Sequence, residues 1–192
     1  MERPDVTFYF DFIDPLSYLL DLELTAVATP DDRVVRYAPF ELRPPPTALT
    51  TPADAELVWR WREARAIADV QGVALVEPAV VPWSRKAHEL RLFAASHDLG
   101  DEARTAIFAA FFASGLDIGR VDVLVGIARG LGLDTTETKA VLDVDRFEAD
   151  VSASRVAAIA AGVHDAPVVI GGSDRVEGYR NRTDLSTFLR HT

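Results

Sequence analysis

The amino-acid sequence predicts one α/β domain whose core is interrupted by a helical insertion. Three observations lead to this prediction: the chain opens with a β-α-β pattern, continues for about a hundred residues with helical periodicity, and returns to a strand pattern at its end. A chain of 192 residues is long enough for a single domain with a substantial core. We therefore expect a core formed by residues 1–52 and 163–192, with residues 53–162 as the insertion.

The opening pattern begins with an aromatic and β-branched segment, residues 6–12, which is typical of a strand buried on both faces. A helix is expected to follow, because Asp14 is a favourable N-cap and Pro15 suits the first helical position. Apolar residues then keep helical spacing as far as Pro30. A second strand is expected at residues 34–40, so the two strands should form a parallel pair joined by a crossover helix.

The central segment is predicted to form several helices, because its apolar residues recur at helical spacing between short breaks. These breaks are expected at residues 72–82, 98–101, 115–119 and 132–135. We interpret each apolar stripe as part of the core, since burial is the usual role of such a stripe. The stripes consist of Leu57, Trp61, Ala64 and Ala68; of Ile107, Phe108, Phe111 and Phe112; and of Val121, Leu124, Ala128 and Leu131.

The end of the chain is predicted to form a β-hairpin and a last helix. Residues 167–170 have the pattern of a strand, and the glycines of residues 171–174 indicate a turn. A short strand is expected near Val176, and the apolar residues Leu185 and Leu189 then follow helical spacing.

Composition excludes several classes of function. Thirty acidic against twenty basic residues give a net charge of −10, so we expect no nucleic-acid partner. The longest apolar run, residues 106–113, is too short to span a membrane, and the N-terminal residues do not resemble a secretory signal. We therefore expect a cytoplasmic protein without a membrane partner.

The absence of cysteine removes a further set of functions. Without a thiol the chain has no disulfide, no thiolate metal site and no sulfur nucleophile of its own. Its four histidines also do not fall into a metal-ligand spacing, so no metal is expected.

Residues 8–19, Phe-Tyr-Phe-Asp-Phe-Ile-Asp-Pro-Leu-Ser-Tyr-Leu, resemble the opening of the DsbA-type branch of the thioredoxin superfamily. This branch includes FrnE-like thiol oxidoreductases, 2-hydroxychromene-2-carboxylate isomerases and kappa-class glutathione transferases. Further matches follow in family order at residues 40–44, 84–88, 111–112 and 162–167, so the resemblance covers nearly the whole chain. It implies a thioredoxin-like fold with an all-helical, DsbA-like insertion, in agreement with the predicted element order.

The same resemblance identifies the candidate catalytic residues. Where the oxidoreductases carry Cys-Pro-x-Cys at the start of the first helix, this chain has Asp14, Pro15, Leu16 and Ser17. Dithiol–disulfide exchange by the chain's own residues is therefore chemically excluded. In the isomerases and transferases a serine takes the first position and interacts with the thiol of glutathione. The resemblance thus implies a role for Asp14 and Ser17, and it leaves open whether the chain is an enzyme.

Asp14 has two interpretations. It is either a helix cap that stabilises the first turn by roughly 1 kcal/mol, or a general base or positioning carboxylate at the mouth of a pocket. About 4 Å from a glutathione thiolate, its negative charge would repel that thiolate by roughly 4 kcal/mol before screening, at an effective dielectric constant near 20. Ser17 is likewise either a hydroxyl bonded back to the helix or a member of the site.

The candidate substrate-binding residues lie in two segments near the end of the chain. The resemblance places the family's cis-proline loop at Ala166 and Pro167, where a backbone edge faces the active site, and we expect a cis bond there. Glutathione-using relatives carry a Ser-Asp pair at the start of the last helix. This chain has Tyr179 and Arg180 after Gly178, and arginine at a helix start favours anions.

Two functions stay open at this point. The leading hypothesis is a cysteine-less family member that binds a small molecule, such as glutathione or another thiol, beside the first helix and the cis-proline loop. It would support a non-redox isomerisation or transfer, without a covalently bound cofactor. The alternative is a non-catalytic binding or partner protein. An open, polar cleft near Asp14 favours the first, and a cleft filled by Leu16, Tyr18 and Trp83 favours the second. The resemblance also allows a homodimer.

Overall fold

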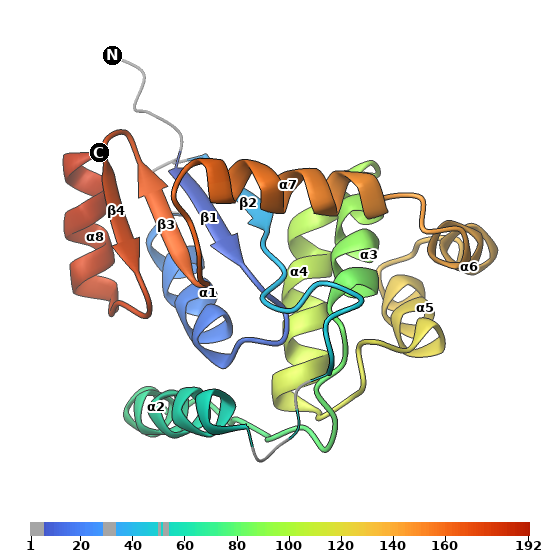
Figure 1. The fold of residues 1–192 in the computed structure, drawn as a ribbon, viewed down its shortest axis with the longest axis horizontal. Helices are drawn as coiled ribbons and strands as arrows, with labels where there is room; N and C mark the ends of the chain where they lie inside the picture. The colour runs from blue at the N-terminus through green and yellow to red at the C-terminus, as the bar shows by residue number, and fades with distance from the viewer. Residues whose placement is uncertain (1–5, 29–33, 50, 52–53) are drawn as a thin grey trace.

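The computed structural model describes residues 6–28, 34–49, 51 and 54–192, and these residues form the predicted α/β arrangement (Figure 1). In chain order the elements are β1 (Val6–Phe10), α1 (Pro15–Ala28), β2 (Val35–Pro39), α2 (Ala55–Gln71), α3 (Arg85–Ala95), α4 (Gly100–Phe108), a π-helical turn (Ala109–Ala113), α5 (Val121–Gly130), α6 (Thr135–Asp143), α7 (Glu148–Ala160), β3 (Val168–Gly171), β4 (Asp174–Glu177) and α8 (Arg182–His191). The expected helix end at Pro30 and the expected first residue of the insertion, residue 53, lie outside the described residues.

The strands of the described residues form one mixed sheet in the order β2-β1-β3-β4. β1 and β2 are parallel, with Phe8 opposite Tyr37, so the predicted crossover through α1 is confirmed. β3 runs antiparallel to β1, with Val169 opposite Phe8, and β4 completes the predicted hairpin.

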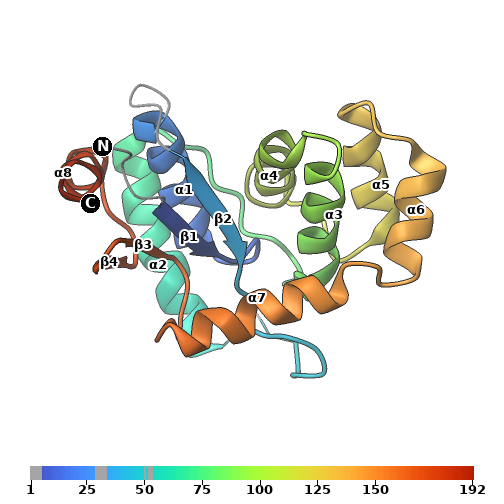
Figure 2. The same ribbon diagram turned by 90° about the horizontal axis from the view of Figure 1, so that it is seen from above.

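Different helices cover the two faces of this sheet (Figure 2). Phe8 and Phe10 belong to the main apolar core, together with Leu19 of α1 and Leu185 of α8. Tyr9 packs on the other face, in the smaller apolar cluster that includes a buried alanine of α7. Because successive residues of a strand point to opposite faces, β1 is apolar at nearly every position, as predicted for a strand buried on both sides.

The helices of the central segment differ in what they contact. α3 packs against α4, α5, α6 and α7, whereas α2 lies against α1 and α7 lies against β2. The predicted apolar stripes are confirmed as core, with Leu57, Val121 and Leu131 partly buried and the other members fully buried. The division of the chain into core and insertion at residues 53 and 162 stays a prediction.

The prediction of an unbroken helical segment between residue 135 and residue 162 is wrong. The structure ends α6 at Asp143 and begins α7 at Glu148. Asp145 turns the chain with φ 52°, a left-handed conformation that short polar side chains tolerate better than bulky ones. Neither glycine nor proline marks this turn, so the pattern contained no breaker signal.

Candidate functional site

Asp14 caps the first helix, as predicted. Its Oδ2 accepts hydrogen bonds from the Ser17 backbone N–H and from the Ser17 hydroxyl, both at 2.7 Å. The Ser17 Oγ in turn accepts a bond from the Asp11 N–H at 3.3 Å. Asp14 and Ser17 are both buried, so these bonds replace the hydration that the two side chains lose.

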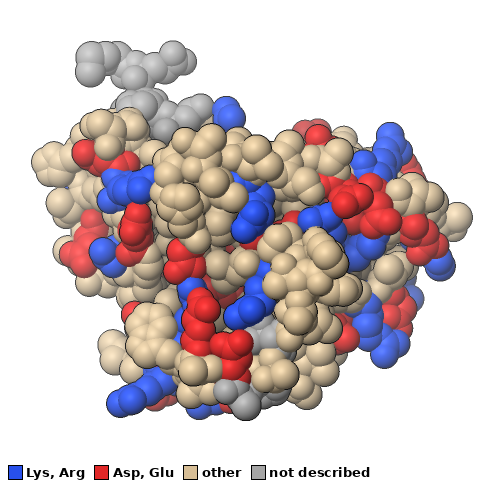
Figure 3. Space-filling model, in the orientation of Figure 1, with Lys and Arg blue, Asp and Glu red and all other residues tan. Residues whose placement is uncertain are grey.

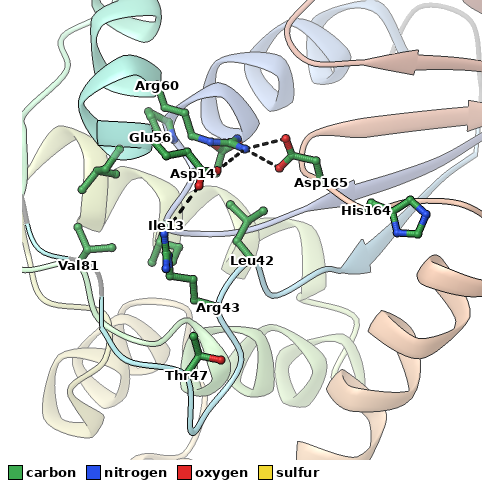
Figure 4. A pocket seen from close by; sticks show the side chains of 12 residues that line it. Ile13, Asp14, Leu42, Arg43, Thr47, Glu56, Arg60, Val81, His164 and Asp165 are labelled. Carbon is green, nitrogen blue, oxygen red and sulfur yellow. Dashed lines mark hydrogen bonds and ion pairs between the residues drawn. The ribbon is translucent and has the colours of Figure 1, made fainter. Parts of the chain in front are cut away.

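Arg60 of α2 is the cationic partner of Asp14 (Figure 4). Its Nη1 donates to Asp14 Oδ1 at 3.2 Å and to the Ala166 carbonyl oxygen at 2.9 Å. Its Nη2 donates to both carboxylate oxygens of Asp165, at 2.5 and 2.7 Å, and to Glu56 Oε1 at 3.2 Å. One guanidinium therefore connects the start of α1 with the cis-proline loop.

The packing of α2 brings Arg60 to this place. Asp54 caps the helix by accepting the Glu56 N–H at 3.1 Å, and Trp61 and Ala64 are buried in the main core. Arg60 precedes Trp61 and so lies at the edge of the buried stripe, where its long side chain reaches the neighbouring helix α1.

The pKa values of Asp14 and Arg60 are both raised, but for different reasons. Burial raises the pKa of Asp14 to about 6, although Arg60 and the two Ser17 bonds act to lower it. Burial by itself would lower the pKa of Arg60, but Asp14, Asp165 and Glu56 raise that pKa above its ordinary value. Arg60 therefore stays charged, whereas Asp14 exchanges its proton at a pH of about 6.

A cavity of about 400 Å³ opens beside this pair. It is lined by Ile13, Asp14, Pro15, Leu42, Arg43, Thr47, Glu56, Leu57, Arg60, Val81, His164 and Asp165. Leu16 and Tyr18 are buried in the main core, and Trp83 donates its indole N–H to the Thr47 carbonyl at 2.9 Å. None of these three side chains lines the cleft, which is open and has polar as well as apolar walls, and an unfilled cleft favours the small-molecule hypothesis.

A second cavity of about 230 Å³ lies beside the cis-proline loop. Its walls include Ala166 and Pro167, and it shares Arg60, His164 and Asp165 with the first cavity. Figure 4 shows Asp165 directed at Arg60 and His164 directed away from the Asp14–Arg60 pair. The Arg60–Asp165 ion pair thus lies between the two spaces.

The predicted cis bond between Ala166 and Pro167 is confirmed. The backbone edge at Ala166 is occupied, however, by groups of the chain itself. The Ala166 N–H donates to Asp165 Oδ1 at 2.8 Å, and its carbonyl accepts from Arg60. A ligand that uses this edge must replace those contacts, and the role of Ala166 and Pro167 in substrate binding stays a prediction.

Tyr179 and Arg180 lie apart from the Asp14 cavity. The Tyr179 hydroxyl accepts a hydrogen bond from Gln71 Nε2 at 2.7 Å and donates one to Glu23 at 3.4 Å. Tyr179 lines another cavity, of about 460 Å³, along α2. Arg180 is exposed and donates to the Tyr179 carbonyl at 2.7 Å. The structure therefore does not bring these two residues together with Asp14 and Ser17, and their binding role stays a prediction.

Sequence reasoning missed Arg60 and Asp165. Arg60 is one of three arginines in α2, with Arg62 and Arg65, and nothing in their spacing shows which of them meets α1. The usable signal is its place beside Trp61, at the edge of the buried stripe, because a buried carboxylate such as Asp14 requires a cationic partner.

The surface agrees with the charge balance of the sequence. On the face shown in Figure 3, basic and acidic side chains are intermixed. A polyanion approaching this face would meet acidic groups beside the basic ones. Within the described ranges, no helix is both long enough and apolar enough to cross a membrane.

The mixed sheet, the cis-proline loop against the start of α1 and the added helices define a thioredoxin-like protein with a DsbA-type arrangement. The family model of the DSBA-like thioredoxin domain matches residues 5–190, and the chain belongs to this family. The predicted family and fold are thereby confirmed.

Known proteins of this fold include an isomerase and a disulfide reductase. The 2-hydroxychromene-2-carboxylate isomerase of Sphingobium xenophagum is 25% identical over 183 residues, which cover 90% of this chain and 94% of that protein. A solved structure of a 2-hydroxychromene-2-carboxylate isomerase superposes with a TM-score of 0.81 at 21% identity, covering 97% of this chain and 93% of the other. The cytosolic disulfide reductase DsbM of Pseudomonas aeruginosa, solved with glutathione, gives a TM-score of 0.74 at 17% identity, covering 97% and 98%.

Proposed function

We propose that the chain binds a small thiol, with glutathione as the first candidate, in the cavity beside Asp14 and Arg60, and supports a non-redox isomerisation or transfer there. The observation that carries this proposal is the open cavity at the start of α1, with Asp14 and Arg60 in its wall, where the resemblance places the family's sulfur-handling residue. Two neighbours of the same fold support it, one an isomerase and the other a reductase solved with glutathione.

Arg60 changes the electrostatic argument against a thiolate. The repulsion expected from the sequence assumed that Asp14 is a lone charge. Its carboxylate instead pairs with the Arg60 guanidinium at 3.2 Å, and this pair presents a much smaller negative field than a free carboxylate. The Arg60 guanidinium at the cavity wall would be a strong donor to an anionic sulfur or oxygen that replaces one of its exposed partners, Glu56 or Asp165.

In this arrangement Asp14 acts through Arg60. The Asp14 side chain is fully buried, whereas that of Arg60 is 8% exposed, so a ligand would meet the guanidinium first. The carboxylate of Asp14 already accepts bonds from Ser17 and from Arg60. We propose that it offsets part of the charge of Arg60, which the Ala166 carbonyl, Asp165 and Glu56 also hold, while the Ser17 hydroxyl fixes Asp14.

Calorimetric titration with glutathione tests the proposal. We expect saturable binding at millimolar or lower concentration, and Arg60→Met should weaken it about tenfold or more, the usual loss for a charged hydrogen bond. Arg62→Met removes an exposed arginine from the same helix and should leave the dissociation constant unchanged. Absence of glutathione binding by the folded wild-type chain would refute the proposal.

Turnover decides between the two functions left open by the sequence. The assay follows by absorbance the loss of 2-hydroxychromene-2-carboxylate in the presence of glutathione, because the related isomerase takes its name from this compound. Loss of the compound would support the isomerase function. Binding without turnover would favour the non-catalytic alternative. Reduction of insulin is expected with neither reading, because the chain has no thiol.

A further inference from the structure

We infer that the Asp165 side chain occupies a carboxylate-binding site, called the seat below, whose donors are Arg60 Nη2 and the Ala166 backbone N–H. The molecule bound by this chain then carries a carboxylate that replaces the Asp165 side chain on these donors. The inference rests on the proposed function, because both concern the same cavity, and it adds the chemical class of the ligand.

Two donor nitrogens, Arg60 Nη2 and the Ala166 backbone N, make three contacts with the Asp165 carboxylate. Arg60 Nη2 lies 2.5 and 2.7 Å from its two oxygens, and the backbone N–H of Ala166 donates to Oδ1 at 2.8 Å. A planar guanidinium combined with a backbone N–H matches the shape and the charge of a carboxylate. The donors come from α2 and from the cis-proline loop, so the fold assembles this seat from distant parts of the chain.

The donors of the seat are fixed, whereas its occupant is exposed. Arg60 is held from behind by Asp14 and by the Ala166 carbonyl, and its side chain is 8% exposed. The Asp165 side chain is 61% exposed. An ion pair with one partner in solvent contributes little to stability, so an external carboxylate competes with Asp165 at low cost.

Glu56 is the other exposed carboxylate on Arg60, and it fits the role less well. It makes one contact with Arg60, at 3.2 Å, its other oxygen lies 3.8 Å from Arg43, and the structure shows no bond from it to Ala166. Its departure would free a single donor position. The departure of Asp165 frees an N–H of Arg60 Nη2 and the Ala166 N–H together.

The position of Asp165 between the two cavities gives its departure a steric consequence. Both cavities, of about 400 and 230 Å³, are lined by Arg60 and Asp165. When the Asp165 side chain turns into solvent, the two spaces join at the freed donors. A ligand whose carboxylate binds there can extend towards Pro15 on one side and towards Pro167 on the other.

The test compares benzoate with benzamide, two probes of nearly equal size that differ in the carboxylate. Calorimetric titrations are made with the wild-type chain and with Asp165→Ala, Asp165→Asn and Asp174→Ala. We expect Asp165→Ala to bind benzoate about tenfold or more tightly than the wild type and benzamide no better. Asp165→Asn keeps the size of the side chain, and its affinity for benzoate should lie between those of the wild type and of Asp165→Ala. It carries the test if the alanine variant does not fold. Asp174→Ala removes an exposed carboxylate of β4 and controls for net charge.

Two results would overturn the inference. One is no gain in affinity for benzoate in either Asp165 variant, and the other is an equal gain in affinity for benzamide, which would show only that the cavity has become larger. In amide spectra, the benzoate complex of Asp165→Ala should shift the Ala166 N–H signal, and an unmoved signal would place the probe elsewhere. The two proposals fail separately. A benzoate gain without glutathione binding refutes the thiol ligand and supports the seat, whereas glutathione binding without a benzoate gain refutes the seat alone.

Discussion

Two buried carboxylates at helix α1, its cap residue Asp14 and Asp21 within it, each pair with an arginine from another helix, and comparing these two separates a candidate site from core. Asp14 pairs with Arg60 at 3.2 Å, and Asp21 pairs with Arg104 at 2.8 Å. Burial raises the pKa of both aspartates to about 6, against the pull of the arginine in each case. By ionisation alone the two pairs are alike.

They differ in what surrounds the arginine. Arg104 lies over the Tyr37 ring, 3.6 Å from its centroid, and neither Arg104 nor Asp21 lines any of the three cavities described above. Arg60 stands at the wall of two cavities and shares an exposed carboxylate, Asp165. A perturbed pKa reports burial, and access to a ligand has to be shown separately.

The largest expected effect concerns stability. Arg104→Met leaves the Asp21 carboxylate buried without its closest cation, and we expect the free energy of unfolding to fall by about 3–5 kcal/mol. Arg60→Met should cost about 1–2 kcal/mol, because Asp14 keeps two hydrogen bonds from Ser17. Urea unfolding of both variants at neutral pH measures the difference. Equal losses would contradict the distinction between a core pair and a cavity pair.

The pH dependence of stability provides the next test. The pKa of Asp21 is about 6 in the folded chain against 3.8 as its ordinary value, so the folded state binds the extra proton between these two values. This group therefore stabilises the fold most below about pH 4, and its contribution falls by about 3 kcal/mol as the pH rises through 6.

Asp21→Asn removes this titration and should flatten the fall of stability with rising pH. Urea unfolding at about pH 4, 5, 6 and 7 measures the slope, which does not depend on the constant cost of the substitution. Asp14→Asn should flatten the same window to a similar extent. An unchanged slope in both variants would mean that neither carboxylate has a raised pKa.

The sequence predicted the parts of this molecule that depend on neighbouring residues. The buried strand before Asp14, the cap formed by Asp14 and the helix that begins at Pro15 follow from local patterns, and all are confirmed. The cis bond at Pro167 followed from a family motif. These features require no knowledge of how distant segments pack.

The site itself depends on packing between distant segments. Arg60 bonds to Asp14, 46 positions away, and to Ala166, 106 positions away. The first contact depends on the packing of α2 against α1, and the second on the place of the cis-proline loop beside α2. Spacing along the chain contains no information on this crossing. For the same reason the sequence treated Asp14 as a lone charge, and it grouped Tyr179 with a cavity that the structure places elsewhere.

The smallest expected effect is that of Asp14→Ser, and it tests how Asp14 acts. Serine is nearly as good an N-cap as aspartate, so the loss of stability should be about 1 kcal/mol or less. Arg60 keeps its bonds to Asp165, Glu56 and the Ala166 carbonyl, and it loses one of the charges that offset its own. Glutathione should therefore bind more tightly, by about fivefold for 1 kcal/mol.

The outcome of the titration distinguishes the two interpretations of Asp14. A general base would give unchanged affinity and lost turnover on the same substitution, and weaker binding would mean that Arg60 cannot keep its place without Asp14. Asp21→Ser on the same helix is the matched control: it removes an equally buried carboxylate, and it should lower stability while leaving the glutathione dissociation constant unchanged. If both serine variants altered glutathione binding alike, the effect would come from the stability of α1, and the distinction between the two carboxylates would fail.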